Sequence, residues 1–116
     1  MSLRTPDPVI IAPATPPGVS ALAVIRLSGQ GSIELVQRIF VGKPLTDQPS
    51  HTLHLGLIKD DNVPIDEVVV SVYKAPNSFT RENSVEISCH GSPLIVQRII
   101  ALCLREGAQR AGPGEF

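Results

Sequence analysis

Alternating apolar and polar residues predict a β-strand over residues 84–90. Successive side chains of a strand point to opposite faces, so this segment has one apolar and one polar face. The apolar face consists of Val85, Ile87 and Cys89, and the polar face of Ser84, Glu86, Ser88 and His90. One face can therefore enter a core while the other presents a carboxylate, two hydroxyls and an imidazole.

A helix over residues 93–105 is predicted to follow this strand directly. Gly91 bends the chain, Ser92 is a suitable N-cap and Pro93 fits the first helical position. Apolar residues nearly surround the helix, so we expect it to be buried on more than one side and to end at Gly107. A helix N-terminus attracts anions, so this junction is a candidate binding site. From residue pattern alone, an amphipathic strand followed by a capped helix is the simpler interpretation.

The rest of the pattern predicts four more strands and one more helix. The strands are expected at residues 9–12, 21–27, 52–58 and 67–73, and the helix at residues 32–40. The order is therefore ββαβββα. Strands that cluster in pairs and threes favour an α+β fold with a mainly antiparallel sheet and two helices.

The composition fits one domain with an aliphatic core, because 42% of the 116 residues are hydrophobic but only 3% are aromatic. Ten basic and eleven acidic residues give a net charge of −1, which offers no electrostatic footprint for nucleic acid or an anionic membrane. The uncharged run at residues 8–25 is interrupted by prolines and so predicts no membrane-spanning helix. Cys89 and Cys103 form no C-x-x-C motif, and as reduced core residues they weakly favour a cytoplasmic protein.

Common catalytic and metal-binding motifs do not match this sequence. It has no G-x-x-x-x-G-K-[ST] phosphate loop, and the third glycine of a dinucleotide fingerprint would fall at Glu34. His51 and His54 are three positions apart on a predicted strand, so their side chains point to opposite faces and cannot chelate one metal. Asp60 and Asp61 are interpreted as a solvated turn.

One polar constellation remains as a candidate site. Its members are Arg26, Thr80, Arg81, Glu82, Glu86 and His90. They suit a flat, polar ligand, because a carboxylate such as Glu86 can accept two parallel hydrogen bonds from an amidine-like edge. For Arg26, the alternative is an ordinary arginine at a strand end that reaches solvent.

Three segments carry a family resemblance: ATPPGVSALAVIRLSG at residues 14–29, NSFTRENSVEISCHGSP at residues 77–93 and PGEF at residues 113–116. They resemble the N-terminal domain of the tRNA-modification GTPases of the MnmE family, also called TrmE. The resemblance implies that residues 1–116 form a single folate-binding and dimerisation domain, similar to the folate-binding domain of aminomethyltransferases. In the family a helical domain with an inserted G domain follows, so this chain is expected to be a fragment that lacks both.

The resemblance also implies a cellular role. Family members act in the cytoplasm with an FAD-dependent partner, MnmG (GidA), and modify the wobble uridine of tRNA. The implied cofactors are 5-formyl-tetrahydrofolate or a related folate, with GTP, magnesium and potassium in the absent G domain. This chain is expected to be a homodimer with no membrane association. Without a phosphate loop, we expect it neither to bind nor to hydrolyse GTP and not to be catalytic alone.

Two site residues carry over by motif. The arginine of the family's R-[LI]-S-G is Arg26, and the glutamate of V-x-E-[IL] is Glu86; both contact folate in the family. A possible additional pocket is formed by Thr80, Glu82, His90 and Gly91. Two folate-contacting lysines of the family, one after PGEF and one at the extreme C-terminus, are missing. The usual T-G-E-D is TREN at residues 80–83 and H-G-G is HGS at residues 90–92, which leaves the loop's shape open.

Two other functions remain open. The first is a purely structural dimerisation module without folate binding, which a folate titration would distinguish. The second is a self-contained enzyme of the aminomethyltransferase type. That enzyme requires a second folate-binding half in the same chain, and 116 residues leave no room for it.

Overall fold

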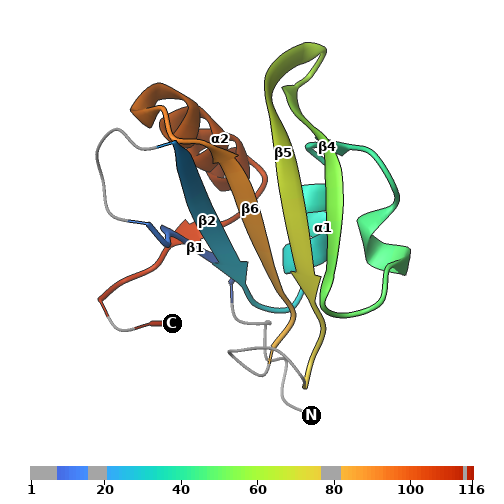
Figure 1. Cartoon of the computed structure of the whole chain (residues 1–116). Helices are drawn as coiled ribbons and strands as arrows, with labels where there is room; N and C mark the ends of the chain where they lie inside the picture. The colour runs from blue at the N-terminus through green and yellow to red at the C-terminus, as the bar shows by residue number, and fades with distance from the viewer. Residues whose placement is uncertain (1–7, 16–20, 77–81, 114) are drawn as a thin grey trace.

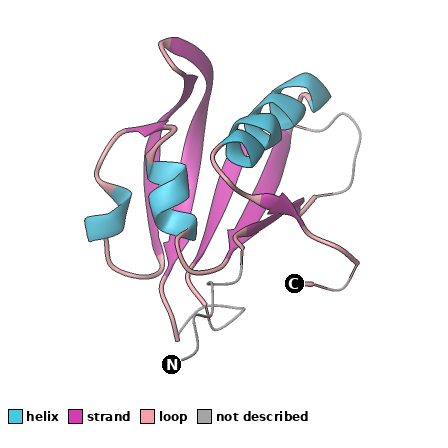
Figure 2. Cartoon of the chain, turned by 180° about the vertical axis from the view of Figure 1, so that it is seen from behind, coloured by secondary structure: helices cyan, strands magenta, loops and turns pink. Residues whose placement is uncertain are grey.

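The computed structural model describes residues 8–15, 21–76, 82–113 and 115–116. In this part of the chain, one sheet has two α-helices on one face; Figure 1 shows it from the open face and Figure 2 from the helical face. The strands are β1 (Ile10–Pro13), β2 (Leu22–Ser28), β3 (Phe40–Val41), β4 (Thr52–Asp60), β5 (Val63–Tyr73), β6 (Ser84–His90) and β7 (Gln109–Arg110). The helices are α1 (Ser32–Gln37), a 3₁₀ turn η1 (Leu45–Asp47) and α2 (Pro93–Arg105).

The sheet order is β3-β4-β5-β6-β2-β1-β7. Within the described residues, β1 and β7 form a parallel pair and every other neighbouring pair is antiparallel. This confirms the predicted α+β class with a mainly antiparallel sheet and two helices. The predicted order lacked β3 and β7, which are only two residues long.

The junction of β6 and α2 forms as predicted. Both elements have their expected bounds, and the Ser92 hydroxyl accepts the Ile95 N–H at 3.4 Å as an N-cap. Gly107 follows the helix with a φ of +113°, a left-handed backbone that favours glycine. Local capping signals therefore determine where this helix starts and ends.

Two other boundaries differ from the prediction by three residues or more, whereas those of β1, β2 and β4 differ by one or two. Helix α1 ends at Gln37, because Arg38 and Ile39 donate their N–H groups three residues back and Phe40 then pairs with Ile58 as β3. Strand β5 begins at Val63 instead of residue 67, because the β4–β5 hairpin continues up to the pair Asp60 and Val63.

The core lies between the sheet and the helices and is aliphatic, as predicted. Its largest fully buried side chains are Ile11, Ile25, Leu27, Ile33, Leu45, Ile58, Ile87, Ile99, Ile100, Val36, Val68 and Val70. Cys89 and Cys103 are free and buried within it. The predicted apolar face of β6 is thus the face that packs against the helices.

Helix α2 buries one side, not several. Ile99, Ile100, Leu102 and Cys103 are buried, whereas Pro93, Leu94, Gln97, Arg98 and Ala101 are exposed. The expectation of burial on more than one side is therefore wrong for this chain. The apolar residues of α2 offer no support for a dimer, so the case for one has to come from another surface.

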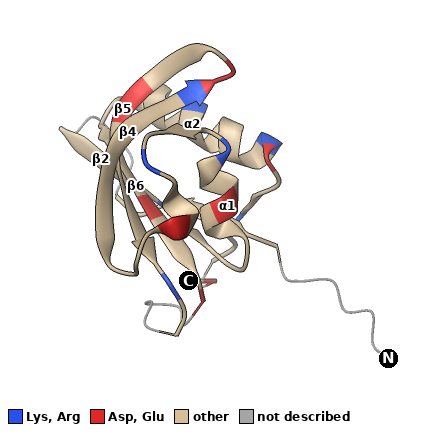
Figure 3. Cartoon of the chain, turned by 90° about the vertical axis from the view of Figure 1, so that its right-hand side faces the viewer, with Lys and Arg blue, Asp and Glu red and all other residues tan. Residues whose placement is uncertain are grey.

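Charged residues of both signs are interspersed along the strands and helices, as the colours in Figure 3 show. Two ion pairs join the ends of elements: Arg38 Nε lies 2.8 Å from Glu106 Oε1, and Arg105 Nη1 lies 2.7 Å from Asp60 Oδ1. Asp60 therefore ends β4 in an ion pair, while Asp61 takes the turn with a φ of +53°. None of the helices in the described ranges is long and apolar enough to cross a membrane.

Candidate functional site

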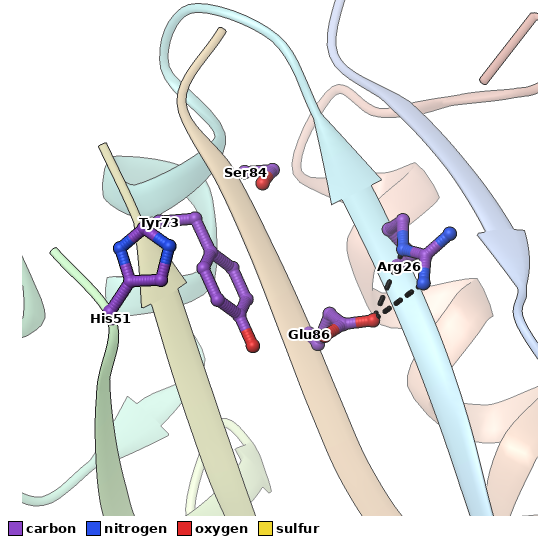
Figure 4. Close-up of a pocket in the computed structure, with 5 residues that line it drawn as sticks. All are labelled: Arg26, His51, Tyr73, Ser84 and Glu86. Atoms are coloured by element: carbon purple, nitrogen blue, oxygen red, sulfur yellow. Dashed lines mark hydrogen bonds and ion pairs between the residues drawn. The ribbon is translucent and has the colours of Figure 1, made fainter. Parts of the chain in front are cut away.

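Arg26 and Glu86 face each other on the open side of the sheet. The register of β2 and β6 places them directly opposite, and Ser71 of β5 is opposite Glu86 on its other side. Arg26 donates from Nε at 3.1 Å and from Nη2 at 2.8 Å, and both bonds end on Glu86 Oε2 (Figure 4). The structure thus brings together the two residues that the family motifs single out.

The pair is partly accessible, with 33% of the Arg26 side chain and 22% of the Glu86 side chain exposed. An ionised carboxylate has about four acceptor positions on its two oxygens. Arg26 binds Oε2 through both Nε and Nη2. The two oxygens of Glu86 together have more acceptor positions than these two bonds use, so a ligand can also bind the carboxylate.

A cavity of about 240 Å³ opens beside this pair. It is lined by Arg26, His51, Tyr73, Ser84 and Glu86. Cavities for drug-sized ligands usually measure about 300–1,000 Å³, so this one has room for a single ring system. Figure 4 shows His51 and Tyr73 on one side, Arg26 on the other, and Ser84 and Glu86 of β6 between them.

His51 and Tyr73 form an aromatic pair that the sequence analysis missed. Their ring centroids are 5.1 Å apart at 87°, an edge-to-face arrangement. His51 had been considered only as a metal ligand together with His54. A usable signal was present, because Tyr73 pairs with Ser84 and so lies on the same face as Glu86, but this requires the register of β5 against β6.

The Tyr73 hydroxyl stays protonated at neutral pH. Burial raises the pKa of Tyr73 and a hydrogen bond with Ser71 lowers it, while the Glu86 carboxylate raises it by its charge and by a hydrogen bond, and the charge of Arg26 lowers it. Since the ordinary pKa of tyrosine is about 10, the raised pKa keeps the phenol neutral. The hydroxyl therefore remains a hydrogen-bond donor, and Glu86 is one of its partners.

His90 and Gly91 lie outside this cavity. His90 is four positions after Glu86 on β6, which puts their Cα atoms roughly 13 Å apart at about 3.3 Å per residue. His90 instead meets Asp66, whose carboxylate lies 2.7 Å from Nδ1 and accepts the His90 backbone N–H at 2.8 Å. Gly91 is buried and donates its N–H to Ala21.

The remaining predicted residues divide into two groups. Glu82 is exposed and lines two neighbouring cavities, one with Ser28 and Glu115 and the other with Asn83. Thr80 and Arg81 lie outside the described residues. Among the residues that are described, no cluster of three or more His, Cys, Asp or Glu side chains is placed to hold a metal ion.

Phe116, the last residue of the PGEF segment, lies next to the site. The Phe116 ring centroid lies 6.0 Å from the Arg26 guanidinium carbon, within the range of a cation–π contact. The site therefore draws on four parts of the sequence: β2, His51 just before β4, the β5–β6 region and the last described residues.

Comparison with known proteins gives consistent matches. The family described as "GTP-binding protein TrmE N-terminus" matches residues 9–116. A tRNA modification GTPase MnmE of Cytophaga hutchinsonii is 50% identical over 107 residues, covering 92% of this chain and 23% of that protein. Proteins of the same name from Flavobacterium johnsoniae and Listeria innocua are 52% and 51% identical, each covering 92% of this chain and 24% of its relative. The chain thus spans about a quarter of the length of these relatives.

Proposed function

Since the chain belongs to the TrmE N-terminal family, we propose that it binds a tetrahydrofolate derivative and forms a homodimer within a GTPase that modifies tRNA. The folate is 5-formyl-tetrahydrofolate or a close relative, which carries a one-carbon unit. The parent protein works in the cytoplasm with the FAD-dependent protein MnmG on the wobble uridine. GTP, magnesium and potassium belong to its G domain, and this chain contributes the folate site.

The observation that carries the folate proposal is the Arg26–Glu86 pair at the edge of a ring-sized cavity. The amino-pyrimidinone edge of a pterin has adjacent N–H donors, and a carboxylate is the matching double acceptor. Both Arg26 bonds end on Oε2, so the ring's parallel pair uses Oε1 and takes one Oε2 position from Arg26, which keeps the other. Arg26 then supplies positive charge and fixes the carboxylate in place.

Isothermal titration of 5-formyl-tetrahydrofolate tests this function, with a chain extended to include the family's lysine segments. Removing one partner of a buried charged hydrogen bond costs about 2–5 kcal/mol, so Glu86→Ala should weaken binding about 30-fold or more. Glu86→Gln keeps the shape but turns one acceptor into a donor that faces a donor, so it should also bind weakly. Ser88→Ala is the matched control, because Ser88 lies two residues further along the same face of β6 and does not line the cavity.

Two results would count against the proposal. If the wild-type protein binds no folate, the chain is the purely structural dimerisation module. If Glu86→Gln binds as tightly as the wild type, the ring is not held by Glu86.

The surface that we propose for the dimer is the open face of β4, next to the edge of the sheet. Leu53 and Leu55 are 69% and 65% exposed on this face. On the outer side, β3 pairs only with Leu57 and Ile58, so within the described ranges residues 52–56 have no neighbouring strand at that edge. Exposed apolar edge strands are normally covered, since they invite association. A second copy of the chain is the occupant we propose for this edge.

A further inference from the structure

We infer that the His51–Tyr73 pair is the wall against which the ligand's ring packs. This wall selects planar heteroaromatic rings over ligands without a ring that can also donate hydrogen bonds to Glu86. The identity of that ring as a pterin rests on the proposed function. The wall itself rests on the geometry of the cavity and on the backbone at His51.

His51 is held in an unfavourable backbone conformation. Its φ is +64°, in the left-handed region that L-residues rarely adopt. Such conformations persist only where the surroundings hold them, and they gather at functional sites. Here the His51 N–H donates to Val72 at 2.7 Å, which fixes the residue at the open end of the β4–β5 pair, next to Tyr73.

The imidazole is fixed as well as the backbone. Ser50 Oγ lies 2.8 Å from His51 Nδ1 and accepts the Lys74 N–H at 2.8 Å. Because Lys74 already donates to this oxygen, the hydroxyl proton of Ser50 is free to bond Nδ1. This arrangement favours the tautomer with the proton on Nε2, which gives the wall a hydrogen-bond donor of its own.

The aromatic pair and the ion pair stand on opposite sides of one small space. Along the sheet the order is His51 and Tyr73, then Ser84 and Glu86, then Arg26, and Figure 4 shows the Tyr73 hydroxyl directed towards the side of Glu86. In a cavity of about 240 Å³ lined by both residues, a ring that donates to Glu86 lies beside Tyr73. The two contacts therefore act on the same ligand.

This combination narrows the ligand class. An alkyl guanidine or amidine can donate two parallel hydrogen bonds to Glu86 but has no ring to pack against Tyr73. A pterin or guanine ring has both the donor edge and the flat face. Aromatic pairs contribute beyond the area that they bury, so the wall should discriminate between these two kinds of ligand.

The test uses the chain's single tyrosine. With ring-labelled tyrosine, the chain gives one tyrosine signal in NMR, and that signal belongs to Tyr73. Bare pterin and guanine are added in one arm, an alkyl guanidine in a second, and 5-formyl-tetrahydrofolate in a third. Pterin should shift the Tyr73 signal through its ring current, and the alkyl guanidine should bind about 2- to 10-fold more weakly, the scale of one aromatic contact.

Variants distinguish loss of packing against the wall from loss of the folded structure. Tyr73→Leu should weaken pterin binding about 10-fold, whereas Tyr73→Phe keeps the ring and should stay within about threefold of the wild type. His51→Ala should also weaken binding. His54→Ala is its matched control, because His54 belongs to the same strand region, bonds Thr52 and does not line the cavity. Unchanged amide spectra show that each variant is folded.

The outcomes distinguish this inference from the proposed function. If pterin binds but Tyr73→Leu and His51→Ala bind it as well as the wild type, the wall is refuted while the Glu86 result stands. If bare pterin or guanine binds with the expected dependence on Tyr73 but the folate does not bind even the chain extended by the lysine segments, the wall is right and the folate function is wrong. If none of these rings shifts Tyr73 at millimolar concentration, the wall is refuted.

Discussion

The ring of Phe116 lies over the guanidinium of Arg26, with 6.0 Å between the ring centroid and Cζ. The last residue of the PGEF segment thus contacts the same arginine that bonds Glu86. This contact gives the segment a physical role, because a guanidinium held by a ring has fewer orientations to lose when a ligand binds.

Replacing Phe116 should therefore weaken folate binding through Arg26. A partly exposed cation–π contact contributes about 0.5–1 kcal/mol, so Phe116→Leu should cost about two- to fivefold in affinity. Titration of the wild type, Phe116→Leu, Arg26→Ala and the double variant measures the coupling. If Phe116→Leu costs as much without Arg26 as with it, Phe116 acts on something else.

The dimer should depend on the open face of β4. Leu53→Glu places a charge where the second copy would pack and should give a monomer in sedimentation experiments at tens of micromolar. Leu94→Glu is the matched control, because Leu94 is also 69% exposed but lies on α2, on the other face of the sheet. A wild-type monomer contradicts the dimer, and a dimer that survives Leu53→Glu contradicts the proposed surface.

Gly56 should not tolerate a side chain. A Cβ there would overlap the Phe40 ring and the Val41 carbonyl oxygen, which close the β3–β4 edge. Overpacking of this kind costs about 1–3 kcal/mol, so Gly56→Ala should lower the free energy of unfolding by that amount in urea titrations. Gly112→Ala is the comparison, since its nearest neighbour is the flexible Glu115 carboxylate; equal stability of the two variants would contradict the packing argument.

The two cysteines should make stability fall at alkaline pH. Burial raises the pKa of Cys103 to about 12 and of Cys89 to about 11, with nearby carboxylates adding to both shifts. An unfolded thiol titrates near about pH 8.5, so between that pH and about 11 the unfolded state holds fewer protons and gains relative stability. Below about pH 8.5 both states are protonated, and the full stability is present.

Urea midpoints at about pH 7 and about pH 10 measure this loss. A variant with Cys89→Ala and Cys103→Ala should lose less stability between these two pH values than the wild type. Tyr73, whose pKa is also raised, remains in the variant and accounts for part of the residual loss. An identical pH dependence in both proteins would show that the thiols do not contribute.

The sequence predicted those features that depend on neighbouring residues. The alternation of β6, the cap at Ser92 and the glycine after α2 are local signals, and their bounds were correct. The strands β3 and β7 are two residues long and exist only because a partner strand lies beside them, so no local period marks them. Helix α1 ends before its predicted end for the same reason, because Phe40 pairs with Ile58 of β4.

The candidate site shows the same division. Arg26 and Glu86 were named from motifs, but their ion pair follows from the register of β2 against β6, sixty residues apart in the chain. His51 and Tyr73 required the register of β4, β5 and β6 together. His90, placed with the site by its spacing on β6, lies at the other end of the strand and bonds Asp66.

The Arg26–Glu86 ion pair also leaves the cavity without a net charge from these two residues. Each charge is neutralised by the other, so the pair attracts dissolved ions only weakly. A neutral ring can enter without displacing a counter-ion, whereas a charged solute has to compete with one member of the pair for the other. The same two residues that bind the proposed ligand thus reduce competition from dissolved salt ions.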